Sequence, residues 1–222
     1  IIQLQDIKVK EKLLLGVLPV AHFTIGGVKI NEECRTTVEG LYAAGEVVGG
    51  IHGADRLAGN ALAEAIVFGA RAGYHAAEYS KSRKLDTIDE NQLKEEITSL
   101  TSCYNIKEDQ SLKILKNALL DTMWQNVGPV RSKEKLDKTI ELIFNLEKQI
   151  NELPSVRNGI KWHKVIEFTN MLKVSEMITR SAIFRTESRG THFRIDFPYE
   201  RDEWLAHIVI QKSSPLKKVP IT

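Results

Sequence analysis

The sequence has little of what marks several large classes of protein. Its 222 residues include two cysteines, Cys34 and Cys103, which have no metal-ligand spacing and cannot form a disulfide framework. No apolar run approaches the length of a membrane-spanning helix. The net charge of +2 gives no strong attraction to nucleic acid or to an acidic membrane. These features, with 42% hydrophobic and 27% charged residues, predict a globular protein in a reducing compartment such as the cytoplasm.

The first residues also lack the marks of a processed secretory protein. The segment IIQLQDIKVKEKLLLG has no initiating Met and no small-residue cleavage site, so it does not have the pattern of a signal peptide. We therefore expect the sequence to begin inside a longer chain.

The character of the chain changes near residue 85. Residues 17–51 are rich in Gly, Val, Ile and Thr, which predicts short strands joined by tight turns, and Asn60 is placed to cap an Ala-rich helix that follows. The middle region has little Gly or Pro, and the charged, aromatic tail ends in a predicted edge strand. The predicted fold class is an α/β segment followed by an all-α helical bundle, with its first boundary at residues 81–86. The predicted domains are 1–85, 86–185 and a C-terminal extension, 186–222.

Apolar residues recur at helical spacing along three segments of the middle region, which favours a three- or four-helix antiparallel bundle. Asp89 and Ser132 are suitable N-caps for two of these helices. The residues expected to face the core are Leu112, Leu115, Leu119, Met123, Leu136, Ile140, Ile143, Leu146, Ile150, Ile166, Met171, Val174 and Ile178.

Three features of the first region indicate chemistry. His22 precedes a glycine pair, at which the backbone must bend or approach another group closely. Glu46 ends a predicted strand directly after Gly45. The loop HGADRLAGNAL places His52 and Arg56 before a helix N-terminus, whose unpaired N–H groups and partial positive charge favour an anionic or electron-rich ligand. The fork of an Arg side chain suits a carboxylate.

Each feature also has a simpler structural explanation. A Gly-rich loop is usually a turn, a single His is often a satisfied structural residue, and Arg56 could form an ordinary surface ion pair. In the tail, Arg189 and His192 could pair locally with Glu187 or Asp196. The residue types alone therefore leave the chemistry open.

Three longer motifs, in order, resemble one known family. PVAHFTIGGVKIN and GLYAAGEVVGGIHGADRLAGNALAEAIVFG are similar to the returning part of the flavin domain in succinate dehydrogenase, fumarate reductase and L-aspartate oxidase flavoproteins. TESRGTHFRIDFPYERDEWLAHIV resembles the C-terminal segment of the same family, and the helices in between fit its helical domain. The resemblance therefore covers nearly the whole chain.

The resemblance implies FAD as the cofactor. Glu46, next to Gly45, would hydrogen-bond the ribose part of FAD. At the helix start that includes Asn60, backbone groups of Ala61 and Leu62 would contact the isoalloxazine ring. The dipole of that helix would favour the negative charge that develops on a reduced flavin.

The resemblance also implies a dicarboxylate substrate. His22 and Arg56 would bind one of its carboxylates and so orient the reacting C–C bond, and His52, in the same loop, is a weaker candidate for substrate binding. The sequence departs from many relatives at Asp55, where they have Asn, and at Ala61, where they have Ser. A carboxylate beside Arg56 could orient or partly neutralise it, and Ala61 keeps the backbone N–H.

Several parts of such an enzyme are expected upstream of this sequence. No GxGxxG fingerprint follows a strand here, so the pocket for the FAD pyrophosphate is not encoded. In the family, the catalytic Arg and the His that some members bond covalently to flavin also lie upstream. We therefore expect the chain alone to be inactive. Its expected partners are an N-terminal flavin-binding half and an iron–sulfur electron-transfer subunit, through which it could associate with a membrane.

The preferred function is interconversion of succinate and fumarate, and two alternatives remain. L-aspartate oxidase is the nearest rival within the family, whereas adenylylsulfate reductase is more distant because its substrate does not need a His and Arg pair. The alternative from another class is a non-catalytic module, in which the helices provide a docking surface for an electron-transfer partner or a second copy of the chain.

Overall fold

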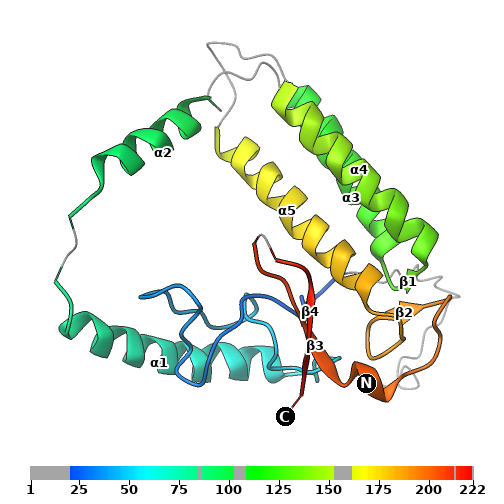
Figure 1. Ribbon diagram of the computed structural model, residues 1–222, viewed down its shortest axis with the longest axis horizontal. Coiled ribbons are helices and arrows are strands. Elements are labelled where there is room, and N and C mark those ends of the chain that lie inside the picture. The colour runs from blue at the N-terminus through cyan, green and yellow to red at the C-terminus, as the bar shows by residue number, and fades with distance from the viewer. Residues whose placement is uncertain (1–20, 85–86, 103–108, 153–161, 213, 222) are drawn as a thin grey trace, which may run out of the picture.

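The computed structural model describes residues 21–84, 87–102, 109–152, 162–212 and 214–221, and within them the chain is mostly helical (Figure 1). The helices are α1 (Asn60–Lys81), α2 (Glu90–Ser102), α3 (Asp109–Val127), α4 (Lys133–Glu152) and α5 (Trp162–Phe184). The short strands are β1 (Val130–Arg131), β2 (Phe193–Arg194), β3 (Ala206–Val209) and β4 (Lys217–Pro220). The start of the predicted strand region, at 17–20, and Cys103 lie outside the described residues.

Helices α3, α4 and α5 pack against one another, and successive helices run in opposite directions (Figure 1). Each buried Leu, Ile or Phe side chain stabilises such a bundle by about 1.5–3 kcal/mol. The stripes predicted on α3 and α4 are confirmed, because they supply most of the core. The buried core residues are Leu112, Leu115, Leu119, Ile143, Leu146, Ile150, Val165, Phe168 and Leu172. The partly buried residues of the predicted stripes are Met123, Ile140, Ile166 and Met171.

The face of α5 that meets the core differs from the predicted one in the second half of the helix, whereas Met171 packs against the core as predicted. The apolar spacing predicts that Val174 and Ile178 face inward, but they are 47% and 37% exposed. The core face instead includes Thr179, which is fully buried and donates its hydroxyl to the carbonyl of Ser175 at 2.7 Å. Because this bond satisfies the hydroxyl inside the helix, a polar residue can occupy a core position. A search for apolar residues alone therefore selects the wrong residues in this half of the helix.

Helix α2 lies apart from the other three, so the bundle has three helices rather than four in the described part of the chain (Figure 1). Both predicted caps are confirmed. The Asp89 carboxylate accepts the Asn91 backbone N–H at 2.8 Å at the start of α2. The Ser132 hydroxyl accepts the Lys135 backbone N–H at 3.3 Å at the start of α4.

Residues 21–59 are folded by turns, and the regular strands of the predicted α/β segment are not formed there. Their β pairings are the isolated bridges Val28–Val48 and Arg35–Tyr42. The predicted close approach at the Gly26–Gly27 pair is confirmed, because a Cβ atom at Gly27 would lie 2.0 Å from the Val47 carbonyl oxygen. Both glycines have positive φ angles, which turn the backbone away from the extended conformation that a strand requires.

Helix α1 follows this region and begins differently from the prediction. Its N-cap is Gly59, with φ of 85°, and no side chain caps the helix, so Asn60 is the first helical residue rather than the cap. Only Glu64 and Ala72 of the helix are buried within the described chain. Most of its large apolar residues are exposed, and they include Leu62, Ile66, Val67 and Tyr74.

The tail connects the end of the bundle to the first region. Strands β1 and β2 pair in parallel over two residues, and the predicted edge strand is β3, which pairs antiparallel with β4. The Thr191 backbone N–H donates to the Ala54 carbonyl at 3.3 Å, so the tail touches the loop that contains His52 and Arg56. No helix in the described ranges is both long and apolar enough to span a membrane.

Candidate functional site

Phe23 brings together two segments that are far apart in the sequence. The guanidinium carbon of Arg56 lies 4.5 Å from the centroid of the Phe23 ring. The ring of His52 meets the same phenyl ring edge-on, with 5.3 Å between centroids. The backbone of His22 is therefore held beside the loop of His52 and Arg56, as a shared site requires. The side chain of His22 is exposed.

Sequence reasoning did not select Phe23, although a signal was present. It is an aromatic residue directly after His22 and shortly before a glycine pair. Its ring can order an Arg by a cation–π contact that contributes about 0.5–1 kcal/mol at an exposed site. It thus acts as a spacer between the two segments.

Arg56 keeps hydrogen-bonding capacity that the described residues do not use. One terminal nitrogen donates to the Leu57 carbonyl at 3.1 Å. The Nε atom is buried and has no hydrogen-bond partner in the described part of the chain. Because a buried unpaired donor is costly, this edge of the guanidinium is suited to an acceptor supplied from outside. A carboxylate can take two parallel bonds from such a fork.

His52 is anchored by Glu64 of α1. The His52 Nε2 atom and the Glu64 Oε2 atom are 2.8 Å apart, and their side chains are 8% and 2% exposed. The contact fixes the position of the imidazole through its Nε2 atom. Glu64 also has a second carboxylate oxygen, Oε1, that is buried without a partner among the described residues.

Glu64 is a further residue that sequence reasoning did not select. An acidic residue in an Ala-rich helix resembles an ordinary solvent-facing position, and its buried partner precedes the helix. The signal that could have found it is its place in the first turns of α1, on the same helix as Ala61. It joins the loop to the helix by a polar contact where apolar packing is scarce.

Glu46 ties the His22 segment to the neighbouring turn. Its Oε1 atom accepts the Thr24 backbone N–H at 2.9 Å. Gly45, with φ of 81°, forms the turn before it, and the Gly45 carbonyl accepts the N–H of Val48 at 2.9 Å. Glu46 as a whole is exposed, so a polar ligand can reach it.

The start of α1 is suited to an electron-rich group. Asn60 donates its backbone N–H to the Leu57 carbonyl at 3.2 Å, while the first turn contains no acidic residue and no capping side chain. The next positions, Ala61 and Leu62, belong to the turn whose N–H groups have no partner within an α-helix. The positive end of the helix dipole at this turn favours an anionic or electron-rich ligand.

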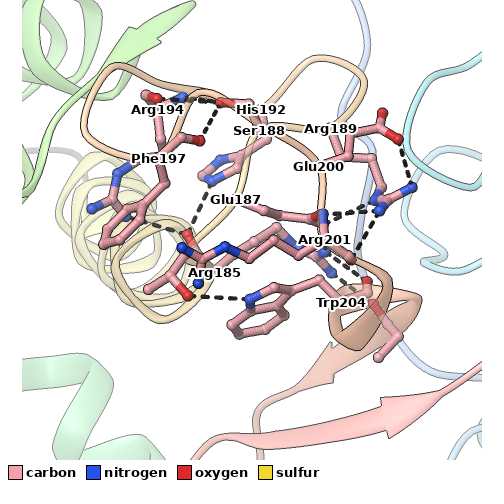
Figure 2. Close-up of polar contacts among 12 residues, drawn as sticks. Arg185, Glu187, Ser188, Arg189, His192, Arg194, Phe197, Glu200, Arg201 and Trp204 are labelled. Carbon is pink, nitrogen blue, oxygen red and sulfur yellow. Dashed lines mark hydrogen bonds and ion pairs between the residues drawn. The ribbon is translucent and has the colours of Figure 1, made fainter.

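In the tail, the two local pairings that the sequence suggested have different outcomes. Arg189 pairs with Glu187 at 2.9 Å, as expected (Figure 2). His192 instead accepts a hydrogen bond from Arg131 at its Nδ1 atom, at 2.8 Å. Asp196 pairs with Arg194 at 2.6 Å.

Comparisons with protein families agree with this architecture. The family model described as an FAD binding domain matches residues 9–62, which contain the His22 segment, Glu46 and the Arg56 loop. The family model described as the C-terminal part of the fumarate reductase flavoprotein matches residues 116–222, which contain most of the bundle and the tail.

Individual relatives are similar over most of the chain. An uncharacterised FAD-dependent oxidoreductase of Methanocaldococcus jannaschii is 41% identical over 209 residues, which is 91% of this chain and 36% of that protein. One polypeptide of the fumarate reductase (CoM/CoB) of Methanothermobacter marburgensis is 38% identical over 89% of this chain and 36% of its own length. L-aspartate oxidase of Acinetobacter baylyi is 34% identical over 95% of this chain and 37% of its own length.

A solved structure of quinol-fumarate reductase with menaquinol molecules superposes with a TM-score of 0.79 at 27% identity. The match covers 91% of this chain and 37% of that one. The chain thus spans about a third of the length of the relatives it matches. Motifs, fold and relatives agree, and the chain belongs to the FAD-dependent flavoprotein family of succinate dehydrogenase and fumarate reductase, which also includes L-aspartate oxidase.

Proposed function

We propose that this chain forms the substrate loop and helical part of a flavoprotein that interconverts succinate and fumarate. The observation that supports this most is the arrangement around Phe23, which places the His22 segment against an Arg56 whose Nε atom is buried and unpaired in the described part of the chain. A dicarboxylate supplies the missing acceptor in its most suitable form, because its two oxygens match the Arg fork.

In this proposal, Arg56 and His22 bind one carboxylate and fix the substrate against the flavin. His52 is a secondary contact through Nδ1, since Glu64 occupies its Nε2. When bound, FAD supplies the group that accepts or returns a hydride across the central C–C bond of the substrate. The catalytic proton-transfer residue is not assigned to this chain.

For the cofactor, we propose that Glu46 beside Gly45 binds the ribose of FAD, and that the first turn of α1, at residues 60–62, meets the isoalloxazine ring. Two observations support this assignment. The first turn of α1 has no side-chain cap, and Glu46 is exposed.

An upstream flavin-binding half is the proposed partner of α1. The exposed Leu62, Ile66, Val67 and Tyr74 form an apolar surface that a water-exposed helix would not keep. We therefore expect the purified chain alone to bind FAD weakly or not at all. A titration followed by flavin fluorescence tests this, and stoichiometric submicromolar binding would show that the chain holds the whole pocket.

Beyond that half, the electron-transfer partner that we propose is an iron–sulfur protein. Association with a membrane would then occur through partner subunits. The bundle provides outward-facing apolar side chains for docking, among them Trp124, Phe144 and Val174.

L-aspartate oxidation is the second candidate, and the similarity to L-aspartate oxidases favours it specifically. Arg56 and His22, the proposed substrate clamp, would hold one carboxylate of aspartate in the same way. The clamp therefore does not distinguish the two reactions. The test is to assay the flavoprotein that contains this chain with succinate, fumarate and L-aspartate. Turnover of succinate or fumarate well above that of aspartate supports the proposal, and the reverse order replaces it with the oxidase.

A further inference from the structure

A turn in the tail presses against the loop that contains Arg56. At Gly190, whose φ is 56°, an added Cβ atom would lie 2.2 Å from the Ala54 carbonyl oxygen and 2.9 Å from the Ala54 side chain. The next residue, Thr191, donates its backbone N–H to the same carbonyl at 3.3 Å. Ala54 is two positions from Arg56, so this contact lies within one short loop of the proposed substrate clamp.

The turn itself is a closed two-residue hairpin. Arg189 donates its N–H to the His192 carbonyl at 2.8 Å, and His192 donates back to the Arg189 carbonyl at 3.0 Å. Gly190 and Thr191 are the two central residues, and a left-handed first position is what such tight hairpins require. The tip that meets Ala54 is therefore fixed by its own backbone.

Glu187 makes the base of this turn rigid. Its side chain is completely buried and accepts hydrogen bonds from the Arg185 side chain at 2.5 Å, from the Arg189 side chain at 2.9 and 3.0 Å, and from the Arg201 backbone N–H at 2.9 Å (Figure 2). Burial alone would raise the pKa of Glu187, but the bonds from Arg189, Arg201 and Arg185 lower it below its ordinary value. The Glu187 carboxylate therefore stays charged near neutral pH and keeps these hydrogen bonds.

The residues around this turn are also bonded to the end of the bundle. The guanidinium of Arg194 is almost fully buried and donates to the Ala182 carbonyl of α5 at 2.7 Å, while it pairs with Asp196. The Ser188 hydroxyl accepts the Arg194 N–H at 2.8 Å and donates to the Phe197 carbonyl at 2.9 Å (Figure 2). A continuous set of contacts therefore runs from α5 through the turn to the loop at Ala54.

We propose that the Glu187–Thr191 turn is a brace that positions Arg56 for the substrate carboxylate, with Gly190 and Glu187 as positioning residues that act through Ala54. The inference rests on the proposed function, because it assigns a purpose to the placement of Arg56. Gly190 is required because any side chain there would push the loop away from the tail. A displacement of an ångström at such a contact can reduce catalysis by about a hundredfold.

The test uses Gly190→Ala in the flavoprotein that contains this chain. We expect the KM for the dicarboxylate and the calorimetric Kd of malonate, a non-reacting dicarboxylate, to rise about ten- to a hundredfold. The flavin content and Tm should change little. Gly40→Ala is the matched control, since Gly40 also has a positive φ, of 77°, but faces only the ring of Tyr79. It should leave malonate binding unchanged.

Two further variants keep the test decisive. Gly190→Asn tolerates the left-handed conformation better but carries the same Cβ atom, so it should weaken malonate binding like Gly190→Ala. If it restores binding, backbone strain rather than the contact is responsible, and the brace is wrong. Ala54→Gly adds no clash and loosens the loop, so it should raise the malonate Kd about two- to fivefold. An unchanged Kd in Ala54→Gly also contradicts the brace.

Arg56→Ala separates this inference from the function on which it rests. If Arg56→Ala binds malonate normally, the clamp and the proposed function fail together. If Arg56→Ala loses malonate binding while the Gly190 variants keep it, only the brace fails. A purely structural role of Gly190 would instead lower Tm, flavin content and activity together, without a selective rise in KM, and that result also overturns the brace.

Discussion

The bundle of α3, α4 and α5 and the region before residue 85, called here the flavin-side region, are stabilised in different ways. Helices α3, α4 and α5 enclose a continuous apolar core, with Leu119 and Phe168 each 1% exposed. Among the described residues before 85, the buried apolar residues are only Cys34, Val48 and Ala72, and order comes from glycine turns and polar contacts. The bundle thus carries its own core, whereas most large apolar side chains of α1 are exposed.

The largest effect that separates the two regions is expected from core truncation. Phe168→Ala should lower the free energy of unfolding of the chain by about 3–5 kcal/mol, because it leaves a cavity in the bundle. Ile66→Ala, on the exposed face of α1, is the matched apolar control and should change it by less than about 0.5 kcal/mol. Urea denaturation followed by circular dichroism measures both.

The same comparison predicts that residues 86–185 fold without the first region. That segment should give a helical circular dichroism spectrum and a cooperative thermal transition. A disordered spectrum, or equal losses in Phe168→Ala and Ile66→Ala, would show that the two regions share one core.

The second largest effect is expected at Arg56, which we propose binds the substrate carboxylate. Arg56→Ala in the flavoprotein should lower kcat/KM for succinate or fumarate by an amount equivalent to about 2–5 kcal/mol, since it leaves a carboxylate unpaired. Arg56→Lys should also lower kcat/KM, because it keeps the charge but loses the two-pronged guanidinium. Flavin content, read from absorbance, should stay normal in both.

The control for this experiment is Arg83→Ala, an exposed Arg that pairs with Glu39 and stacks on Tyr79. It should leave kcat/KM unchanged. Near-normal kcat/KM in Arg56→Ala contradicts the clamp. Loss of flavin in the same variant would move Arg56 from the substrate site to the cofactor site.

A smaller effect is expected at the polar contact that anchors the loop to α1. Glu64→Gln removes the carboxylate from its buried contact with His52 and should destabilise the flavin-side region by about 1.5–3 kcal/mol, as for a hydrogen bond to a charged group. Faster proteolysis of residues 52–59 in the chain measures this. Glu78→Gln is the control, because Glu78 pairs with Lys81 in solvent. Equal proteolysis rates in the two variants would mean that Glu64 does not anchor the loop.

The smallest expected effect is a pH dependence in the tail. Burial and the Arg131 guanidinium lower the pKa of His192 to about 4. The unfolded chain therefore binds more protons than the folded one between about pH 6.5 and 4. The contribution of His192 to the free energy of unfolding is therefore fully present above its unfolded-chain pKa of 6.5, and it decreases as the pH falls through this window. Because His192 is only partly buried, we expect a loss of about 1–2 kcal/mol.

His192→Asn isolates that contribution. Its amide oxygen can accept the Arg131 hydrogen bond, but the side chain does not titrate. Unfolding free energies at pH 7 and pH 4 should differ less in the variant than in the unchanged chain. The same pH dependence in both would assign the acid sensitivity to other groups.

Most residues of the candidate site were selected from the sequence, and the residues that were not selected were missed for physical reasons. His22, Glu46, His52 and Arg56 were selected from their types and their places beside glycines and a helix start, and the family resemblance assigned their roles. The structure gathers the segments of His22, His52 and Arg56 around one phenyl ring. Their roles in binding remain proposals. Phe23 was not selected, because an aromatic residue next to a turn has many uses and its contacts depend on a distant loop.

In the fold, the predicted stripes on α3 and α4 are confirmed because every residue in them is apolar and periodic. The second half of the stripe on α5 was misplaced, since the buried core position there is occupied by the polar residue Thr179 instead of Val174 or Ile178. Asn60 was predicted as a cap on its chemistry, but the left-handed backbone at Gly59 takes that place. Caps at Asp89 and Ser132 were predicted correctly because each depends only on its own helix turn.

By itself, the sequence determined what depends on local order along the chain. It determined where α2 and α4 begin, which faces of α3 and α4 are apolar, and which motifs belong to the flavoprotein family. Only the tertiary structure decided what depends on distant segments. It decided that Glu64 holds His52 and that Gly190 presses on Ala54 beside Arg56. The start and the apolar face of a single helix depend on residues that are close in the sequence, so local patterns predict them. Contacts between distant residues form only when the whole chain packs.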